Sequence, residues 1–236
     1  MTPPLTVLPK ILLLLTLASC SSTLGIDNNY QVNTEVAEKS SVEQKNVLPM
    51  PLRLAFMSGH VSAGIALYHA GEFKMAASHL MHPVSETHAD ERFGLKDIGF
   101  NQEIFESVSA ALETQESAAI LLPLLEKAEK HLDIMRDKAG GDPIKIIGFL
   151  LETTVEEYSV GVRDGKLTDV GEYQDAFGFV LVAAEHARRL SKTSNERLLS
   201  EILSLQDYWL RGPLPVETPT PAEDVALTVN LILSQL

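Results

Sequence analysis

From Leu52 to the C-terminus, apolar residues recur at intervals of three and four positions. This spacing places them on one face of an α-helix, which buries that face against its neighbours. Alternating apolar and polar runs are scarce, and no Asn-Gly pair marks a β-hairpin. We therefore predict an all-α fold, a helical bundle built from antiparallel helix hairpins, as a single domain over residues 49–236.

Breaks in the apolar pattern divide this domain into helices. Pro83 ends the second helix because it lacks an amide hydrogen, and residues 87–91 are a polar loop. Gly140 and Gly141 end a long amphipathic helix, and Asp142 followed by Pro143 caps the next one. The expected helices cover residues 51–68, 73–82, 101–112, 117–138, 143–162, 169–190, 195–209 and 222–236.

The first 19 residues have the pattern of a secretion signal. Lys10 precedes the apolar run 11–17, which is shorter than the roughly 20 residues that span a bilayer. The sequence Leu17-Ala18-Ser19-Cys20 resembles the bacterial lipobox. The resemblance implies a lipoprotein signal peptide over residues 1–19 and fatty acylation, including palmitate, at Cys20, which becomes the mature N-terminus. The alternative is an ordinary signal peptide that happens to contain a cysteine.

Residues 20–48 are rich in Ser, Asn, Glu and Lys and show no apolar period, so we expect a lipidated, disordered tether. A flexible coil of about 28 residues reaches roughly 30 Å. The acylated Cys20 would anchor the protein to the lipid membrane on the periplasmic side of the cell envelope. Ser21 stands where an aspartate retains some lipoproteins in the inner membrane, which favours the outer membrane.

Charge and cysteine content narrow the chemistry further. The formal net charge is −13, and loss of Lys10 with the leader makes the mature chain more negative. Such a charge argues against nucleic acid as a partner and is compatible with cation capture. Because Cys20 is the only cysteine, a metal site in the domain must use histidine, carboxylate or other oxygen ligands.

The first predicted hairpin, whose residues 64–80 resemble a single tetratricopeptide-like unit, turns at Ala70-Gly71. Residues equidistant from this turn lie opposite each other, so His60 reaches the level of His79 and His82. Glu86 follows just beyond Pro83. Three imidazoles and a carboxylate suit zinc, copper or iron, and these four residues are the first-choice metal ligands. The alternative is that His60 packs in the core while His79 or His82 caps a helix.

The second predicted hairpin turns at Asp164-Gly165 and brings acidic side chains to matching levels of two helices. Carboxylates so placed are typical of metal-binding bundles. They form a second-choice ligand group, whose alternative is a solvated acidic face. Its members are Glu156, Glu157, Glu172 and Asp175.

A family resemblance lies in the same segment. The run EEYSVGVRDGKL at 156–167, followed by EYQDAFGF at 172–179, resembles the extracytoplasmic N-terminal region of bacterial iron-permease-type proteins. It implies a periplasmic helical module associated with metal handling, a component of metal transport. No apolar run long enough to span a membrane follows, so we do not expect the permease itself.

Enzyme motifs are not evident: we find no Gly-x-Ser-x-Gly elbow, phosphate-binding loop, dinucleotide fingerprint or His-Glu-x-x-His helix. We expect a protein that is not an enzyme but binds or delivers a metal ion. The resemblance favours iron, divalent or ferric, and the histidines favour zinc or copper. The alternative is a structural or protein-interaction lipoprotein without a cofactor.

Overall fold

The structure is a computed structural model that describes residues 47–190 and 192–236. The chain divides into two units, 1–45 and 46–236, and all described residues belong to the second. The predicted signal peptide, the acylation site Cys20 and nearly all of the predicted tether lie outside the described residues, so these remain predictions.

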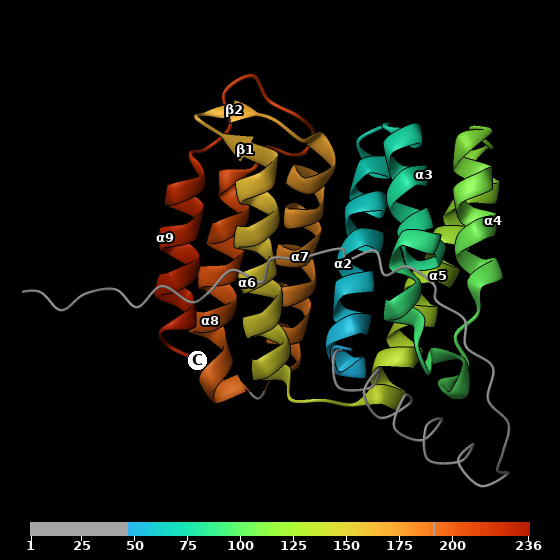
Figure 1. Cartoon of the computed structure of the whole chain (residues 1–236), viewed down its shortest axis with the longest axis horizontal. Coiled ribbons are helices and arrows are strands. Elements are labelled where there is room, and N and C mark those ends of the chain that lie inside the picture. Colours follow the sequence, from blue (N-terminus) through green and yellow to red (C-terminus); the bar gives the residue numbers. More distant parts are fainter. Residues whose placement is uncertain (1–46, 191) are drawn as a thin grey trace, which may run out of the picture. The chain divides into compact units, whose positions relative to one another are not determined.

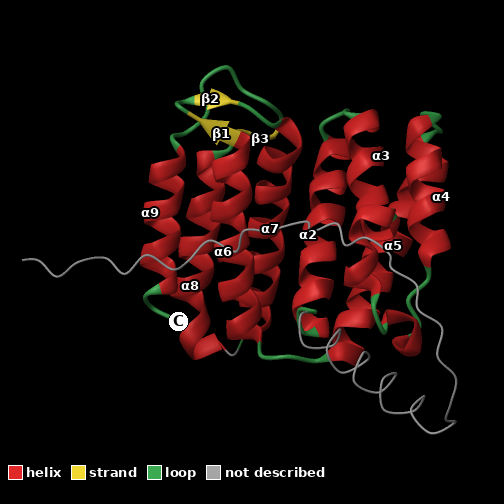
Figure 2. Cartoon of the chain, in the orientation of Figure 1, coloured by secondary structure: helices red, strands yellow, loops and turns green. Residues whose placement is uncertain are grey.

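The described unit is built from α-helices, which confirms the all-α prediction (Figures 1 and 2). None of these helices combines the length and the apolar character needed to cross a membrane. The helices are α2 (Met50–His69), α3 (Phe73–Met81), α4 (Gln102–Glu113), α5 (Ala118–Ala139), α6 (Pro143–Gly161), α7 (Val170–Arg189), α8 (Lys192–Leu205) and α9 (Ala222–Leu233).

Two groups of four helices stand side by side (Figure 1). Within the first group, α2 packs on α3, α3 on α4, α4 on α5, and α5 returns to α2. In the second group, α6, α7, α8 and α9 close a ring in the same way. Each ring buries its own apolar cluster, and the two rings meet mainly where α2 packs against α7.

Helix starts follow the capping residues that the sequence offers. The Asp142 side chain accepts a hydrogen bond from the Ile144 amide, and Pro143 occupies the first turn. Asn101 caps α4 and Asp169 caps α7 in the same manner. Gly140, with a positive φ of 64°, ends α5 where the sequence predicted a helix stop.

Three segments differ from the sequence-based expectations. The helix expected over residues 195–209 is α8, which ends at Leu205, followed by the 3₁₀ helix η4 (Gln206–Tyr208). Residues expected as polar loop belong to the 3₁₀ helix η2 (Glu86–Arg92), which follows the shorter η1 (His82–Val84). Its backbone is held by Arg53, whose guanidinium donates to the carbonyls of Glu91 and Phe93. The turn between α6 and α7 is a two-residue antiparallel ladder of β1 (Val162–Arg163) and β2 (Lys166–Leu167) at one end of the second ring (Figure 2).

Glycines allow α2 to lie close to α7 and to α3. A Cβ on Gly178 of α7 would lie 2.1 Å from the carbonyl oxygen of Gly59 on α2. A Cβ on Gly64 of α2 would lie 2.0 Å from the Leu80 side chain of α3. A side chain at Gly178 would therefore force α7 away from α2, whereas one at Gly64 would first displace the Leu80 side chain.

Candidate metal centre

One histidine from each of three neighbouring segments meets an aspartate from the second ring. His60 comes from α2, His79 from α3, His82 from η1 and Asp175 from α7. One ligand atom from each residue lies within 4.8 Å of all the others. This is the arrangement of donors that a single metal ion needs, with three imidazoles and one carboxylate.

Asp175 lies at the centre of this group and faces all three histidines. Its Oδ1 lies 2.6 Å from His60 Nδ1 and 2.8 Å from His79 Nδ1, and its Oδ2 lies 4.0 Å from His82 Nδ1. The side chains of His60, His79 and Asp175 are each at most 5 % exposed, whereas that of His82 is 28 % exposed. The site is therefore a buried three-residue core with His82 at its solvent side.

The aromatic rings of Phe56 and Phe179 pack against the imidazole of His60. Their centroids lie 4.6 Å and 5.5 Å from that of His60, both in edge-on contact. Such an apolar wall excludes water and fixes the direction of the imidazole. It also lowers the local dielectric, which strengthens the interaction of a cation with the Asp175 carboxylate.

Gln174 selects the tautomer of His79. The Gln174 Nε2 donates to the Pro213 carbonyl at 3.2 Å, so its Oε1 is the atom that faces His79 Nε2 at 2.9 Å. Because that oxygen can only accept, His79 Nε2 carries a hydrogen. In the neutral ring, Nδ1 then holds the lone pair, and it points at Asp175. An orienting partner on the far nitrogen is typical of metal-binding histidines.

The Nδ1 atom of His60 has two polar neighbours, which a single ring hydrogen satisfies poorly. This atom lies 2.6 Å from Asp175 Oδ1 and also 2.9 Å from His82 Nδ1. A ring nitrogen carries either one hydrogen or one lone pair in the ring plane, so it cannot donate to the carboxylate and accept from His82 at once. A cation among these atoms would accept from all the lone pairs together. A tetrahedral ion with bonds near 2.1 Å needs donors roughly 3.4 Å apart, a small spreading of the group.

In the buried core, the Asp175 carboxylate and the His79 imidazole each favour the charged form of the other. Burial by itself would raise the pKa of Asp175, but the hydrogen bonds and charges of His60 and His79 hold it well below its usual range. Burial would lower the pKa of His79, yet its bonds to Asp175 and Gln174 raise it. Without metal, His79 therefore tends to hold a second proton, which a metal ion would replace at Nδ1.

The acidic residues predicted on the second hairpin separate into different environments. Asp175 turns inward to the histidines, and Glu156 is exposed. Glu157 hydrogen-bonds Glu172; burial first, and then that carboxylate, raises the Glu157 pKa to about 9. The charges of Asp175 and Glu156 also raise the Glu157 pKa, so the four acids remain electrostatic neighbours, while Asp175 alone of them lies among the histidines. The side chain of Glu86 lies outside the described residues.

The sequence reasoning found three of the four clustered residues at the first hairpin but assigned Asp175 to the other group. It missed Gln174 as the partner of His79. The adjacency of Gln174 to Asp175 carries no sequence signal by itself, because only the tertiary structure brings these two side chains of α7 to the imidazole of His79 on α3.

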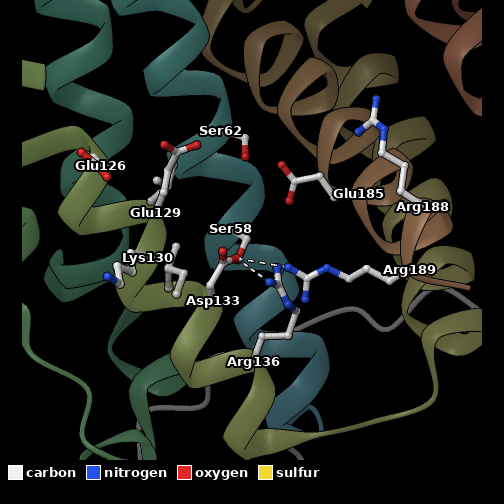
Figure 3. A pocket seen from close by; sticks show the side chains of 12 residues that line it. Ser58, Ser62, Glu126, Glu129, Lys130, Asp133, Arg136, Glu185, Arg188 and Arg189 are labelled. Carbon is white, nitrogen blue, oxygen red and sulfur yellow. Dashed lines mark hydrogen bonds and ion pairs between the residues drawn. The ribbon is translucent and has the colours of Figure 1, made fainter.

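Apart from this cluster, a hollow of about 400 Å³ opens between α2, α5 and α7 (Figure 3). Its walls carry charges of both signs. Asp133 forms ion pairs with Arg136 and Arg189, drawn as dashed lines in Figure 3, and so ties α5 to α7. Glu129 and Glu185 also line it, and burial raises the pKa of each. The charges of Glu185 and Asp133 raise that of Glu129 further, whereas the charge of Arg136 opposes the rise at Glu185. The hollow lacks the convergent imidazoles of the first site.

Comparison with known proteins gives one match. Residues 142–236 match the family described as the iron permease-associated 4-helix bundle domain. The match begins at Asp142, the cap of α6, and covers the ring of α6 to α9, which supports the iron-permease-like character of this helical region. No curated protein and no solved structure matched the chain.

The matched segment contains only part of the candidate metal site. Asp175 lies inside the matched domain, whereas His60, His79 and His82 precede it and belong to the ring of α2 to α5. The His₃Asp group therefore depends on residues outside the matched domain as well as on the domain itself.

Proposed function

We propose that this chain is an envelope lipoprotein that binds one transition metal ion and serves a metal-transport system. The observation that carries the proposal is the convergence of His60, His79, His82 and Asp175. The role in transport is supported by the iron permease-associated domain over residues 142–236. The proposed activity is binding and delivery, not catalysis.

The donor set fits a first-row transition metal. Imidazole suits zinc, copper, iron and nickel, whereas calcium and magnesium prefer oxygen ligands alone. The buried carboxylate of Asp175 offsets part of the charge of the ion, and Gln174 orients His79 from behind. Iron is the candidate that also agrees with the matched domain.

Metal analysis and calorimetric titration of residues 21–236 test the binding. We expect one ion per chain, with Fe²⁺, Zn²⁺ and Cu²⁺ titrated separately under conditions that keep iron reduced. His79→Ala should abolish stoichiometric binding. His69→Ala is the matched control, because His69 is an exposed histidine at the end of α2. Equal binding by the wild type and His79→Ala would refute this site.

The anchor is tested separately, since Cys20 lies outside the described residues. The wild-type protein should incorporate labelled palmitate and stay in the membrane fraction. Cys20→Ala should incorporate no label and leave the membrane. Unchanged labelling in Cys20→Ala would contradict the lipoprotein proposal and leave the metal site unaffected. Absence of metal from every preparation, with membrane attachment intact, would favour the interaction lipoprotein.

A further inference from the structure

The four donors of the proposed metal site differ in how firmly the fold holds them. His60, His79 and Asp175 are almost fully buried, and they belong to α2, α3 and α7. Moving any of the three side chains out of the site requires displacing packed helices. The side chain of His82 is several times more exposed than any of them.

Each buried donor is held by at least two contacts, and for His60 and His79 these include residues that are not donors. The aromatic rings of Phe56 and Phe179 enclose His60. Gln174 holds the far nitrogen of His79, and Asp175 bonds two imidazoles with one oxygen. These constraints hold the three side chains at the site without an ion, so that binding requires only a small spreading of the ligand atoms, which is the preorganisation a binding core needs.

His82 stands at a change of backbone structure. It follows the last residue of α3, begins the 3₁₀ helix η1 and precedes Pro83. Its Nδ1 lies 2.9 Å from His60 Nδ1 but 4.0 Å from the nearer oxygen of Asp175. Its ring also contacts those of His60 and His79, with centroids 4.4 Å and 5.3 Å away. Because the side chain is already 28 % exposed, rotation about its own bonds takes the ring from these contacts toward solvent without moving a helix, and such rotamer changes are fast.

We infer that His82 is the exchange ligand of the site. Its bond to the ion is the first to break when the ion leaves and the last to form when the ion enters. The inference rests on the proposed function. His60, His79 and Asp175 hold the ion, and an incoming donor from an acceptor molecule replaces His82. The exchange breaks one metal–nitrogen bond and forms one bond to the new donor, with no change in the oxidation state of the ion.

The test measures release of Co²⁺, whose visible absorption reports its ligands, from the full mature chain extracted in detergent. Excess EDTA captures the released ion in a stopped-flow experiment. His82→Ala should still bind one ion per chain, with an altered spectrum and release faster by about tenfold or more, since changes in affinity appear mostly in the dissociation rate. His69→Ala should release at the wild-type rate.

Two core variants complete the comparison. His79→Ala and Asp175→Asn should lose stoichiometric Co²⁺ binding while circular dichroism shows an intact helical fold. If His82→Ala loses binding as completely as these variants, His82 is an equal member of the core and the inference fails, while the metal site stands. A wild-type spectrum and release rate in His82→Ala also overturns it. If the wild type binds no Co²⁺ and none of the other metals, the proposed function fails with it.

Discussion

His60 Nδ1 and Asp175 Oδ1 lie 2.6 Å apart although 115 positions separate the two residues in the chain. The contact joins α2 of the first ring to α7 of the second. It lies near a close approach of those helices, where Gly178 faces Gly59. The proposed metal site is therefore also a junction between the two rings.

Metal should stabilise the fold. An ion that binds the folded chain but not the unfolded one adds about 2.7 kcal/mol to the free energy of unfolding when its free concentration is 100 times the dissociation constant. Differential scanning calorimetry with and without the metal identified by titration measures the effect. Asp175→Asn should show no rise in Tm with metal. A rise equal to that of the wild type would exclude Asp175 as a ligand.

Gly178→Ala should destabilise the protein because the new Cβ would meet the Gly59 carbonyl oxygen and the Ala63 side chain. Overpacking of this kind costs about 1–3 kcal/mol. The displaced α7 should also carry Asp175 away from His60 and weaken metal binding. Urea unfolding and metal titration of the same variant measure both effects.

Gly148→Ala is the matched control for this substitution. Its Cβ would make ordinary contacts of 3.7 Å with Leu236 and 3.9 Å with Leu233. Because alanine is the better helix former, we expect a gain of about 0.5–1 kcal/mol. Equal destabilisation by both substitutions would show that close packing of α2 against α7 is not the cause.

Gln174→Met should weaken metal binding by about 10- to 100-fold, because loss of the partner on the far nitrogen frees the tautomer and orientation of His79. Gln174→Glu keeps an acceptor for His79 Nε2 and should retain more of the affinity, despite losing the donor to Pro213. Competition with a chelator of known affinity measures both. Equal affinities of the two variants would argue against tautomer selection.

The metal-free protein should lose stability as the pH rises from about 5 toward 9. Burial and Glu172 raise the pKa of Glu157 in the folded chain to about 9, above its ordinary value of 4.5. Between these values the folded state binds a proton that the unfolded state has released, so the free energy of unfolding falls with increasing pH.

Glu157→Gln keeps a hydrogen-bonding group but cannot ionise, so its stability should change less over this range. Glu156→Gln is the control, because that neighbouring side chain is exposed and its charge makes the smallest of the contributions that raise the Glu157 pKa. Urea unfolding at pH 6, 7 and 8 with a metal chelator present provides the comparison. The same slope in Glu157→Gln as in the wild type would assign the pH dependence to other groups.

The helices and their ends follow from the sequence because their causes are local. The apolar period of three to four residues determined which segments are helical, and Asp142, Pro143 and Gly140 determined where two of them end and begin. The 3₁₀ helix η2 was missed because contacts at its end are non-local: Arg53, nearly 40 positions away, donates to the carbonyl of Glu91 in η2 and to that of Phe93 just after it.

The first hairpin also placed His60 opposite His79 and His82, since a tight turn at Gly71 aligns residues at equal distances from it. Pairing within one hairpin is a local property of the chain, so sequence alone was enough to bring these imidazoles together. Sequence also supplied the kinds of donor, since a single cysteine leaves histidine and carboxylate as the metal ligands.

Only the tertiary structure decided which carboxylate joins the histidines. Asp175, Glu172 and Glu157 are chemically alike, and their spacing along α6 and α7 does not distinguish them. The close approach of α7 to α2 turns Asp175 inward to His60 and leaves Glu172 paired with Glu157. That choice depends on the packing of two rings far apart in sequence, which the periodicity of single helices does not encode.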